Sequence, residues 1–346
     1  SGEDEATVPD LGGTVLVLGP DDQQDDDPLA APFGSSLPGG GAAGDPAEED
    51  GAQDAGTEDP AAFDPYGGAT SGDGDAETGT EALGLVLSGT EAGEVLSGGA
   101  GNDLIDGQGG NDLIDGRDGD DQVEAGLGND AIWGGAGDDT LGGGEGRDSL
   151  DGQAGADVLL GGAGNDSLAG GEGNDILEGA VGADTLLGGP GDDRLDGGAG
   201  DDWLAGGEGQ DRLAGGQGAD QLDGGPGDDW ISGLMGEIDD FDPDFLNGGE
   251  GDDALFLGAG DYASGGPGAD SLEMVPSGGL THIADYDASQ DQLVVRYNPE
   301  LHPDPVLSLE TDAGTGQSTL ILDGTPIAQV SGDTVHLHDV RLVAAA

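Results

Sequence analysis

Aspartate recurs at every ninth position from Asp103 to Asp229 without an exception. Glycine stands two residues before each of these aspartates, so exposed backbone carbonyls accompany every carboxylate. Carboxylate and carbonyl oxygens together are the ligands of Ca²⁺, which accepts about six to eight of them in flexible geometry, whereas Mg²⁺ demands a tighter octahedron. A regular series of carboxylates in glycine-rich turns is therefore typical of cation ligands rather than of catalytic acids.

The aspartates belong to fifteen consecutive nonapeptides of the form G-G-x-G-x-D-x-U-x, where U is aliphatic, between Gly98 and Ser232. We number the positions of this unit one to nine. Position four is always Gly and position eight is always Ile, Leu or Val, while position one departs from Gly only at Ala125. Glycine at this density excludes a helix, because each glycine costs about 1 kcal/mol relative to alanine. The unit instead predicts a glycine turn followed by a very short strand.

Units of this kind must stack on one another, because a single aliphatic side chain per nine residues does not offset the entropy of ordering the backbone. Two nonapeptides make a coil of eighteen residues, and successive coils stack at the inter-strand spacing of about 4.8 Å. Position eight then faces a narrow interior, and each position-six carboxylate lies above the one two units later. These carboxylates repel one another without a cation, so we expect metal binding to supply the missing folding free energy.

The composition also favours metal cations as partners. The chain has 75 acidic residues against 6 basic ones, which gives a formal net charge of −69. Nucleic acids and anionic membrane surfaces need basic patches, so we expect neither as a partner. No apolar run is long enough for a transmembrane segment. Because the chain has no cysteine, disulfides and thiolate metal sites are excluded and the ligands must be oxygens.

The nonapeptides GGAGNDLID, GGAGNDSLA and GGPGDDRLD resemble the RTX, or haemolysin-type, calcium-binding repeats, and this resemblance covers residues 89–273. It implies an all-β parallel β-roll that binds multiple Ca²⁺ ions. It further implies a bacterial protein that type I secretion machinery exports to the extracellular space. Two position-six carboxylates one coil apart would share each ion, as in Asp103 with Asp121 and Asp112 with Asp130. The calcium ligands implied in this way are Asp103, Asp112, Asp121, Asp130, Asp139, Asp148, Asp157, Asp166, Asp175, Asp184, Asp193, Asp202, Asp211, Asp220, Asp229, Asp244, Asp253, Asp261 and Asp270.

The repeat is interrupted once, between residues 233 and 247, where six extra residues precede Asp244. A tolerated surface loop is the simpler interpretation, and a contact for a partner through residues 239–242 is the alternative. The motif then returns with Asp253 and Asp270 at position six and a shortened unit between them.

Two further segments flank the predicted β-roll of residues 83–273. Residues 1–82 are acidic, rich in Pro, Gly and Ala and free of basic residues, which predicts a disordered acidic linker. The apolar run Thr14–Leu18 within it is a candidate strand or docking peptide, but an isolated strand is marginal in water. Residues 274–346 lose the period and gain alternating strands, which predicts a C-terminal β cap. Part of this cap, residues 282–297, resembles the segment that closes many RTX proteins near a secretion signal.

Catalysis finds little support in the sequence. Neither H-E-x-x-H nor G-x-S-x-G occurs, so we expect no enzyme activity from this chain. All four histidines fall in the C-terminal segment. His336 and His338 alternate along an expected strand at residues 334–343, which would place both on one face. Ordinary surface histidines and a transition-metal site are both compatible with this pattern.

Two classes of function remain. The first is a secreted, non-catalytic calcium-binding protein that folds on binding extracellular Ca²⁺ and has a structural, adhesive or matrix role. The alternative is the C-terminal folding and type I export module of a larger enzyme or toxin. We favour the first, because residues 1–82 contain no remnant of a folded domain.

Overall fold

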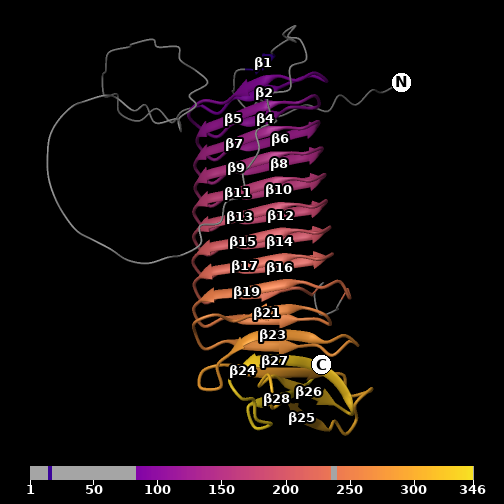
Figure 1. The fold of residues 1–346 in the computed structure, drawn as a ribbon. Helices are drawn as coiled ribbons and strands as arrows, with labels where there is room; N and C mark the ends of the chain where they lie inside the picture. The colour runs from indigo at the N-terminus through magenta and orange to yellow at the C-terminus, as the bar shows by residue number, and fades with distance from the viewer. Residues whose placement is uncertain (1–14, 18–82, 235–239, 346) are drawn as a thin grey trace, which may run out of the picture. The chain divides into compact units, whose positions relative to one another are not determined.

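The computed structural model describes residues 15–17, 83–234 and 240–345, and the statements below refer to these residues. They form strands and turns without a helix, arranged as two sheets of fourteen strands each. Figure 1 shows the strands of the two sheets stacked coil upon coil along the roll. The predicted all-β fold with a parallel β-roll is confirmed. Among the described residues, no helix has the length and apolarity that a membrane crossing needs.

Consecutive strands of the roll alternate between the two sheets, which we call sheet A and sheet B. In spatial order, the strands of sheet A are β1 (Val15–Val17), β2 (Val86–Ser88), β4 (Leu104–Asp106), β6 (Gln122–Leu127), β8 (Thr140–Glu145), β10 (Val158–Ala163), β12 (Ile176–Val181), β14 (Arg194–Ala199), β16 (Arg212–Gln217), β18 (Trp230–Ser232), β20 (Ala254–Leu257), β22 (Ser271–Met274), β24 (Gln292–Tyr297) and β28 (Val340–Ala344).

The strands of sheet B, in the same direction along the roll, are β3 (Val95–Ser97), β5 (Leu113–Asp118), β7 (Ala131–Ala136), β9 (Ser149–Ala154), β11 (Ser167–Glu172), β13 (Thr185–Pro190), β15 (Trp203–Glu208), β17 (Gln221–Pro226), β19 (Phe245–Glu250), β21 (Tyr262–Ser264), β23 (Thr281–Tyr286), β27 (Thr325–Gly332), β26 (Ser318–Leu322) and β25 (Leu307–Thr311).

The register of the roll is eighteen residues, as the repeat predicts. Leu159 pairs with Leu141 on one side and with Leu177 on the other, and all three are position-eight residues. Every position-eight side chain of the fifteen regular units is buried, with at most 2% of its surface exposed. One column of aliphatic side chains from each sheet therefore fills the interior between the two sheets.

Glycine is required at positions two and four for different reasons. Position-two residues have positive φ in nearly every unit, and four of them are not glycine, namely Gln108, Arg117, Gln153 and Ala180, whose φ angles lie between 69° and 84°. At position four, φ lies between 108° and 157° throughout the regular units. A Cβ at Gly164 or Gly182 would also lie less than 3.0 Å from the position-four carbonyl of the preceding coil. Position four therefore accepts only glycine.

The six extra residues near residue 240 leave the stacking intact. Phe245 pairs with Gln221 in the usual parallel register, although the two residues are 24 positions apart in sequence rather than eighteen. Phe241 is 66% exposed, and the Gly218 amide donates to Oδ2 of Asp240 at 2.9 Å. The described part of the insertion is thus a surface loop tied to the roll, while Asp239 lies outside the described residues.

The structure modifies one expectation at the N-terminal side. Val15–Val17 forms β1, which pairs in parallel with β2 through partners such as Leu16 and Leu87. Residues 15–17 of the candidate segment, which the sequence ranked below a linker, are therefore present as a strand because a sheet edge is available to pair with them. The rest of the predicted linker, residues 1–14 and 18–82, lies outside the described residues.

The cap extends both sheets beyond the roll. Strands β23 and β24 still stack in parallel, whereas β25, β26 and β27 form an antiparallel meander at the end of sheet B. The turn between β26 and β27 has positive φ at Asp323 and Gly324, so an Asp-Gly turn joins these two antiparallel strands as a hairpin. The strand expected at residues 334–343 begins only at Val340, because residues 337–339 form a turn.

Candidate calcium-binding rows

The nineteen aspartates that the sequence predicts as ligands are all buried, with at most 3% of each residue exposed. Carboxylates are almost never buried to this degree unless they are paired with a cation or with donors. The few basic side chains do not fill that role, since the described ion pairs of arginine involve other carboxylates, such as Asp115, Asp196 and Glu273. The buried aspartates therefore require donors from the backbone or a metal ion.

The stacking brings the aspartates together in two rows, one along each edge of the roll. Within a row, the backbone amide of each predicted ligand from Asp103 to Asp253 donates to Oδ1 of the aspartate one coil later. The amide of Asp139, for example, donates to Asp157 at 2.7 Å, and the amide of Asp148 donates to Asp166 at 2.8 Å. The partners predicted to share ions, Asp103 with Asp121 and Asp112 with Asp130, are neighbours in these rows.

One oxygen of each carboxylate is left over. At sixteen of the nineteen aspartates the other oxygen, Oδ2, is buried and has no hydrogen-bond partner in the structure. Asp103 and Asp261 differ, because their Oδ2 atoms accept the amides of Gly99 and Gly258 at 2.6 Å. A buried carboxylate oxygen without a hydrogen-bond donor costs free energy. These unpaired Oδ2 atoms therefore mark the positions at which a cation would be stabilised.

The glycine at position one shapes the space beside this oxygen. A Cβ at Gly152 would lie less than 3.0 Å both from Oδ2 of Asp157 and from the carbonyl oxygen of Gly170, and most of the other regular units show the same pair of contacts. We call this space the oxygen cradle. A carboxylate oxygen and a carbonyl oxygen lie beside it, and both are atoms that Ca²⁺ takes as ligands. Position one is therefore glycine for space rather than for its φ angle.

Burial also sets the proton affinity of the rows. The pKa values of Asp139, Asp148, Asp202 and Asp229 are raised to about 7. Burial is the main cause, the backbone amide bond opposes the shift, and neighbouring carboxylates add to it. The pKa of Asp244 rises to about 9 for the same reasons, and Asp261 is the carboxylate that contributes most to this shift. Without a cation these groups are driven toward their neutral forms, whereas a bound cation favours the carboxylates.

The rows extend beyond the predicted ligands at both ends. Glu94 precedes the first row members, and its amide donates to Oδ1 of Asp112 at 2.7 Å. Asp291 follows the last, because Asp270 donates its amide to Oδ1 of Asp291 at 3.1 Å. Glu94 stands nine residues before Asp103, so the period could have found it. Asp291 follows Asp270 by 21 residues, and no periodic signal marks it.

The sequence pattern also did not predict a second row of hydrogen-bonded side chains, which is exposed and runs beside each buried row. The amide of Asp138 donates to Oδ1 of Asp120 at 3.1 Å, and the amide of Ala156 donates to Oδ1 of Asp138 at 2.9 Å. These are position-five residues, which are Asn or Asp in most units. Their bonds point from later coils to earlier ones, opposite to the position-six bonds. Each glycine turn is thus tied to its neighbours in both directions.

A family comparison supports the same assignment. The family model of the RTX calcium-binding nonapeptide repeat, in four copies, matches residues 88–123, 115–150, 151–186, 178–213, 205–237 and 239–263, which together make up just over half of the chain. The chain belongs to the RTX repeat family. RTX repeats bind calcium, and proteins that carry them are typically exported by type I secretion. A comparison with curated proteins finds no match. Which aspartates ligate each ion in this RTX chain stays a prediction.

Ala125 provides a test of the oxygen cradle, because it is the one alanine at position one of the regular units. Its Cβ occupies the space that glycine leaves open beside Asp130, whose Oδ2 has no partner. We expect Ala125→Gly to add or tighten one Ca²⁺ site and Gly152→Ala to weaken one, as measured by calcium titration calorimetry. Ala163→Gly, at exposed position three, is the matched control and should leave the stoichiometry unchanged. Equal stoichiometry and equal affinity in all three variants would contradict the cradle.

The raised pKa values predict how the calcium-free chain responds to pH. Because the carboxyls hold their protons more tightly in the roll than in the unfolded chain, their contribution to stability is fully present below about pH 4. It is lost as the pH rises through about 6 to 7, where Asp121 and Asp139 titrate. In EDTA, circular dichroism should therefore show more β-structure at pH 4.5 than at pH 8. In Ca²⁺ the order reverses, since protons compete with the ion. A calcium-free chain whose β-content does not depend on pH would argue against buried carboxyls.

Proposed function

We propose that this chain is a secreted, non-catalytic adhesive protein whose roll folds when it binds extracellular Ca²⁺. The observation that supports the folding step best is the repeated carboxylate oxygen that is buried without a partner. Extracellular calcium modules have dissociation constants of about 10⁻⁴ to 10⁻³ M, far above cytoplasmic free calcium. The chain would then stay expanded before export, through the mutual repulsion of its carboxylates, and fold outside the cell.

The folding switch has a direct test. At neutral pH the chain should give the circular dichroism spectrum of an unfolded protein in EDTA and a β spectrum in millimolar Ca²⁺. Mg²⁺ at equal concentration is the control, because it retains its waters and fits a flexible oxygen site poorly. A full β spectrum in EDTA at neutral pH, or equal folding in Mg²⁺, would refute calcium as the switch.

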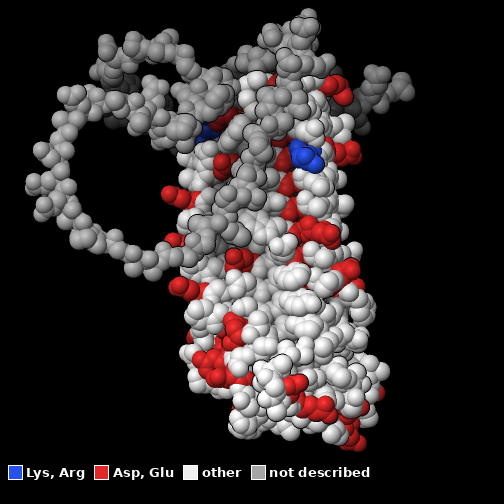
Figure 2. Space-filling model, viewed as in Figure 1, with Lys and Arg blue, Asp and Glu red and all other residues white. Residues whose placement is uncertain are grey.

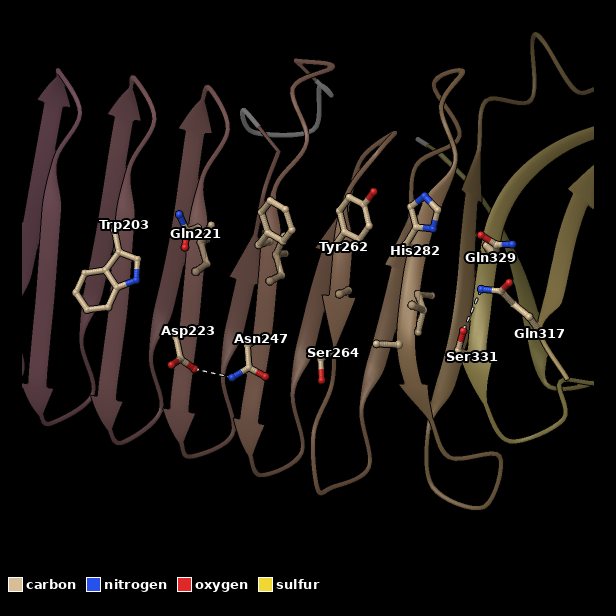
Figure 3. A pocket seen from close by; sticks show the side chains of 16 residues that line it. Trp203, Gln221, Asp223, Asn247, Tyr262, Ser264, His282, Gln317, Gln329 and Ser331 are labelled. Atoms are coloured by element: carbon tan, nitrogen blue, oxygen red, sulfur yellow. Dashed lines mark hydrogen bonds between the residues drawn. The ribbon is translucent and has the colours of Figure 1, made fainter. Parts of the chain in front are cut away.

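The adhesive role is supported by an open trough on the outer face of sheet B, which is a candidate binding surface. It has a volume of about 500 Å³ and spans β15 to β27. Trp203, Phe245 and Tyr262 stand in its aromatic row and are each 42–51% exposed. Phe245 stacks on Tyr262, and Tyr262 stacks on His282 with ring centroids 4.6 Å apart. Figure 3 shows Trp203 on β15, Tyr262 on β21 and His282 on β23 along one line of the trough.

Polar side chains form a second line beside the aromatic one. Asn247 donates through Nδ2 to Oδ1 of Asp223 at 2.8 Å, and Gln317 donates through Nε2 to Oγ of Ser331 at 3.1 Å, as the dashed lines in Figure 3 show. Gln317 comes from the connection between β25 and β26, so the cap supplies one end of the trough. Amides and hydroxyls next to exposed rings can both stack on a ligand and form hydrogen bonds to it.

The charge of the surface selects among ligands. Acidic side chains are scattered over the face in Figure 2, and basic ones are few, so the net charge of −69 would repel an anionic polymer. The trough itself is mostly uncharged, with Asp223 as the one carboxylate among its lining residues. A neutral carbohydrate chain, which offers hydroxyls and apolar ring faces, fits this combination. The trough favours an adhesive role over the alternative of an export module, which would need the folding switch alone.

Carbohydrate binding is measured by affinity electrophoresis in gels that contain dextran, laminarin or hydroxyethylcellulose, with Ca²⁺ present. We expect retardation by at least one of these neutral polysaccharides and at least about tenfold weaker binding by Trp203→Ala, because a ring in the trough supplies most of the contact area. Trp230→Ala is the control, since Trp230 is 39% exposed but lies on sheet A. Absence of retardation in all three gels, or equal loss in the control, would overturn the assignment of the trough while leaving the calcium switch intact.

A further inference from the structure

The connection from β27 to β28 contains a cluster of metal-ligating side chains away from the calcium rows. It carries the chain from sheet B to sheet A just before the last strand. Val335 anchors the connection in the core with 1% of its surface exposed. The following turn is closed twice, because the Asp339 amide donates to the His336 carbonyl at 2.9 Å and the His336 amide donates to Oδ2 of Asp339 at 2.7 Å. The backbone therefore holds these side chains together without a ligand.

Three potential ligand groups converge on this turn. Nδ1 of His336 lies 3.3 Å from Oδ2 of Asp339, and Nε2 of His338 lies 3.1 Å from Oδ1 of the same carboxylate. One donor atom from each of the three residues lies within 4.8 Å of the other two. The two imidazole rings lean toward each other, with centroids 5.2 Å apart and planes inclined by 36°. The turn, rather than the strand alternation expected from sequence, brings the histidines together.

These spacings match the ligand spacings of a tetrahedral metal site. Two donors that each lie about 2.0 to 2.1 Å from one Zn²⁺ ion at tetrahedral angles are about 3.3 Å apart. Both carboxylate–imidazole distances in the cluster are close to this value. The imidazoles are exposed and can rotate toward a common ion, and solvent can supply the remaining ligand. Nitrogen ligands favour Zn²⁺, Ni²⁺ or Cu²⁺, whereas Ca²⁺ takes oxygens.

We propose that His336, His338 and Asp339 bind one transition-metal ion, of the Zn²⁺ class, at the surface of the cap. The other two histidines have different surroundings: Nδ1 of His302 contacts Oδ2 of Asp323 at 2.6 Å, and His282 stacks on Tyr262. A metal ion bound to three residues of one turn fixes the crossing between the sheets and so protects the start of β28 from local opening. The oxygen-lined rows and this nitrogen-containing site therefore take different metals from the same medium.

The proposal is tested on the full chain in saturating CaCl₂, so that the carboxylate rows are already filled. Titration calorimetry with ZnCl₂ should then show one site per chain, and Co²⁺ in its place should give the intense visible absorption of tetrahedral coordination. His336→Ala/His338→Ala should abolish the site. Asp339→Asn keeps an oxygen for the His336 amide but removes the charge, and it should weaken Zn²⁺ binding at least about tenfold.

The matched control is His282→Ala/His302→Ala, which removes the same number of histidines from the cap and should bind Zn²⁺ like the original chain. Circular dichroism in Ca²⁺ checks that every variant is folded. A chain that binds no Zn²⁺ in saturating Ca²⁺ overturns the proposal. Loss of Zn²⁺ binding in the control pair to the same degree as in the His336/His338 pair also overturns it.

Discussion

The stacking of like charges at the spacing of β-strands is the constraint from which the rest of this molecule follows. Each coil places a carboxylate above another, and two unit charges about 4.8 Å apart repel by about 3 kcal/mol at the effective dielectric constant of a protein. A backbone amide satisfies Oδ1 at each step of a row, as between Asp157 and Asp175, but it leaves Oδ2 buried without a partner. The same two sheets that bury the aliphatic core thus create a deficit of positive charge, which a calcium ion between coils would remove.

The glycine pattern records three separate demands of this arrangement. Position one must leave the oxygen cradle open, position two must adopt positive φ, and position four must do so while its α-carbon lies against the carbonyl of the coil before it. These demands differ in strictness. Gln108 and Ala180 adopt φ values of 69° and 77°, which lie in the left-handed region that a residue with a side chain can adopt at a modest cost. The φ values above 100° at position four lie outside that region, and only glycine adopts them readily. This explains why position two varies in sequence and position four does not.

Much of the fold could be predicted because a period carries both the core and the rows. Position eight faces inward and position six meets its neighbour one coil later for the same geometric reason, so a single repeat determines both. Features outside the period were predicted less completely. Asp291 belongs to a row because the fold of the cap places its carboxylate beside the amide of Asp270. Strand β1 forms because it can pair with the open edge of sheet A. The turn that joins His336 to Asp339 also depends on side-chain bonds to the backbone, which an alternating hydrophobic pattern does not reveal.

The cap and the last coil are built as one unit, which bears on how the stack begins to fold. Asp285 of β23 accepts the amides of Gly265 and Gly266 at 3.1 and 2.9 Å, and Asp270 donates its amide to Asp291 of the cap. The cap therefore supplies donors and acceptors in the places where a further coil would supply them. In a one-dimensional stack, nucleation is the costly step and each added coil gains a preformed neighbour. A cap that presents a complete row position thus lowers the cost of ordering the adjacent coil, and calcium binding can then proceed from that end one coil at a time.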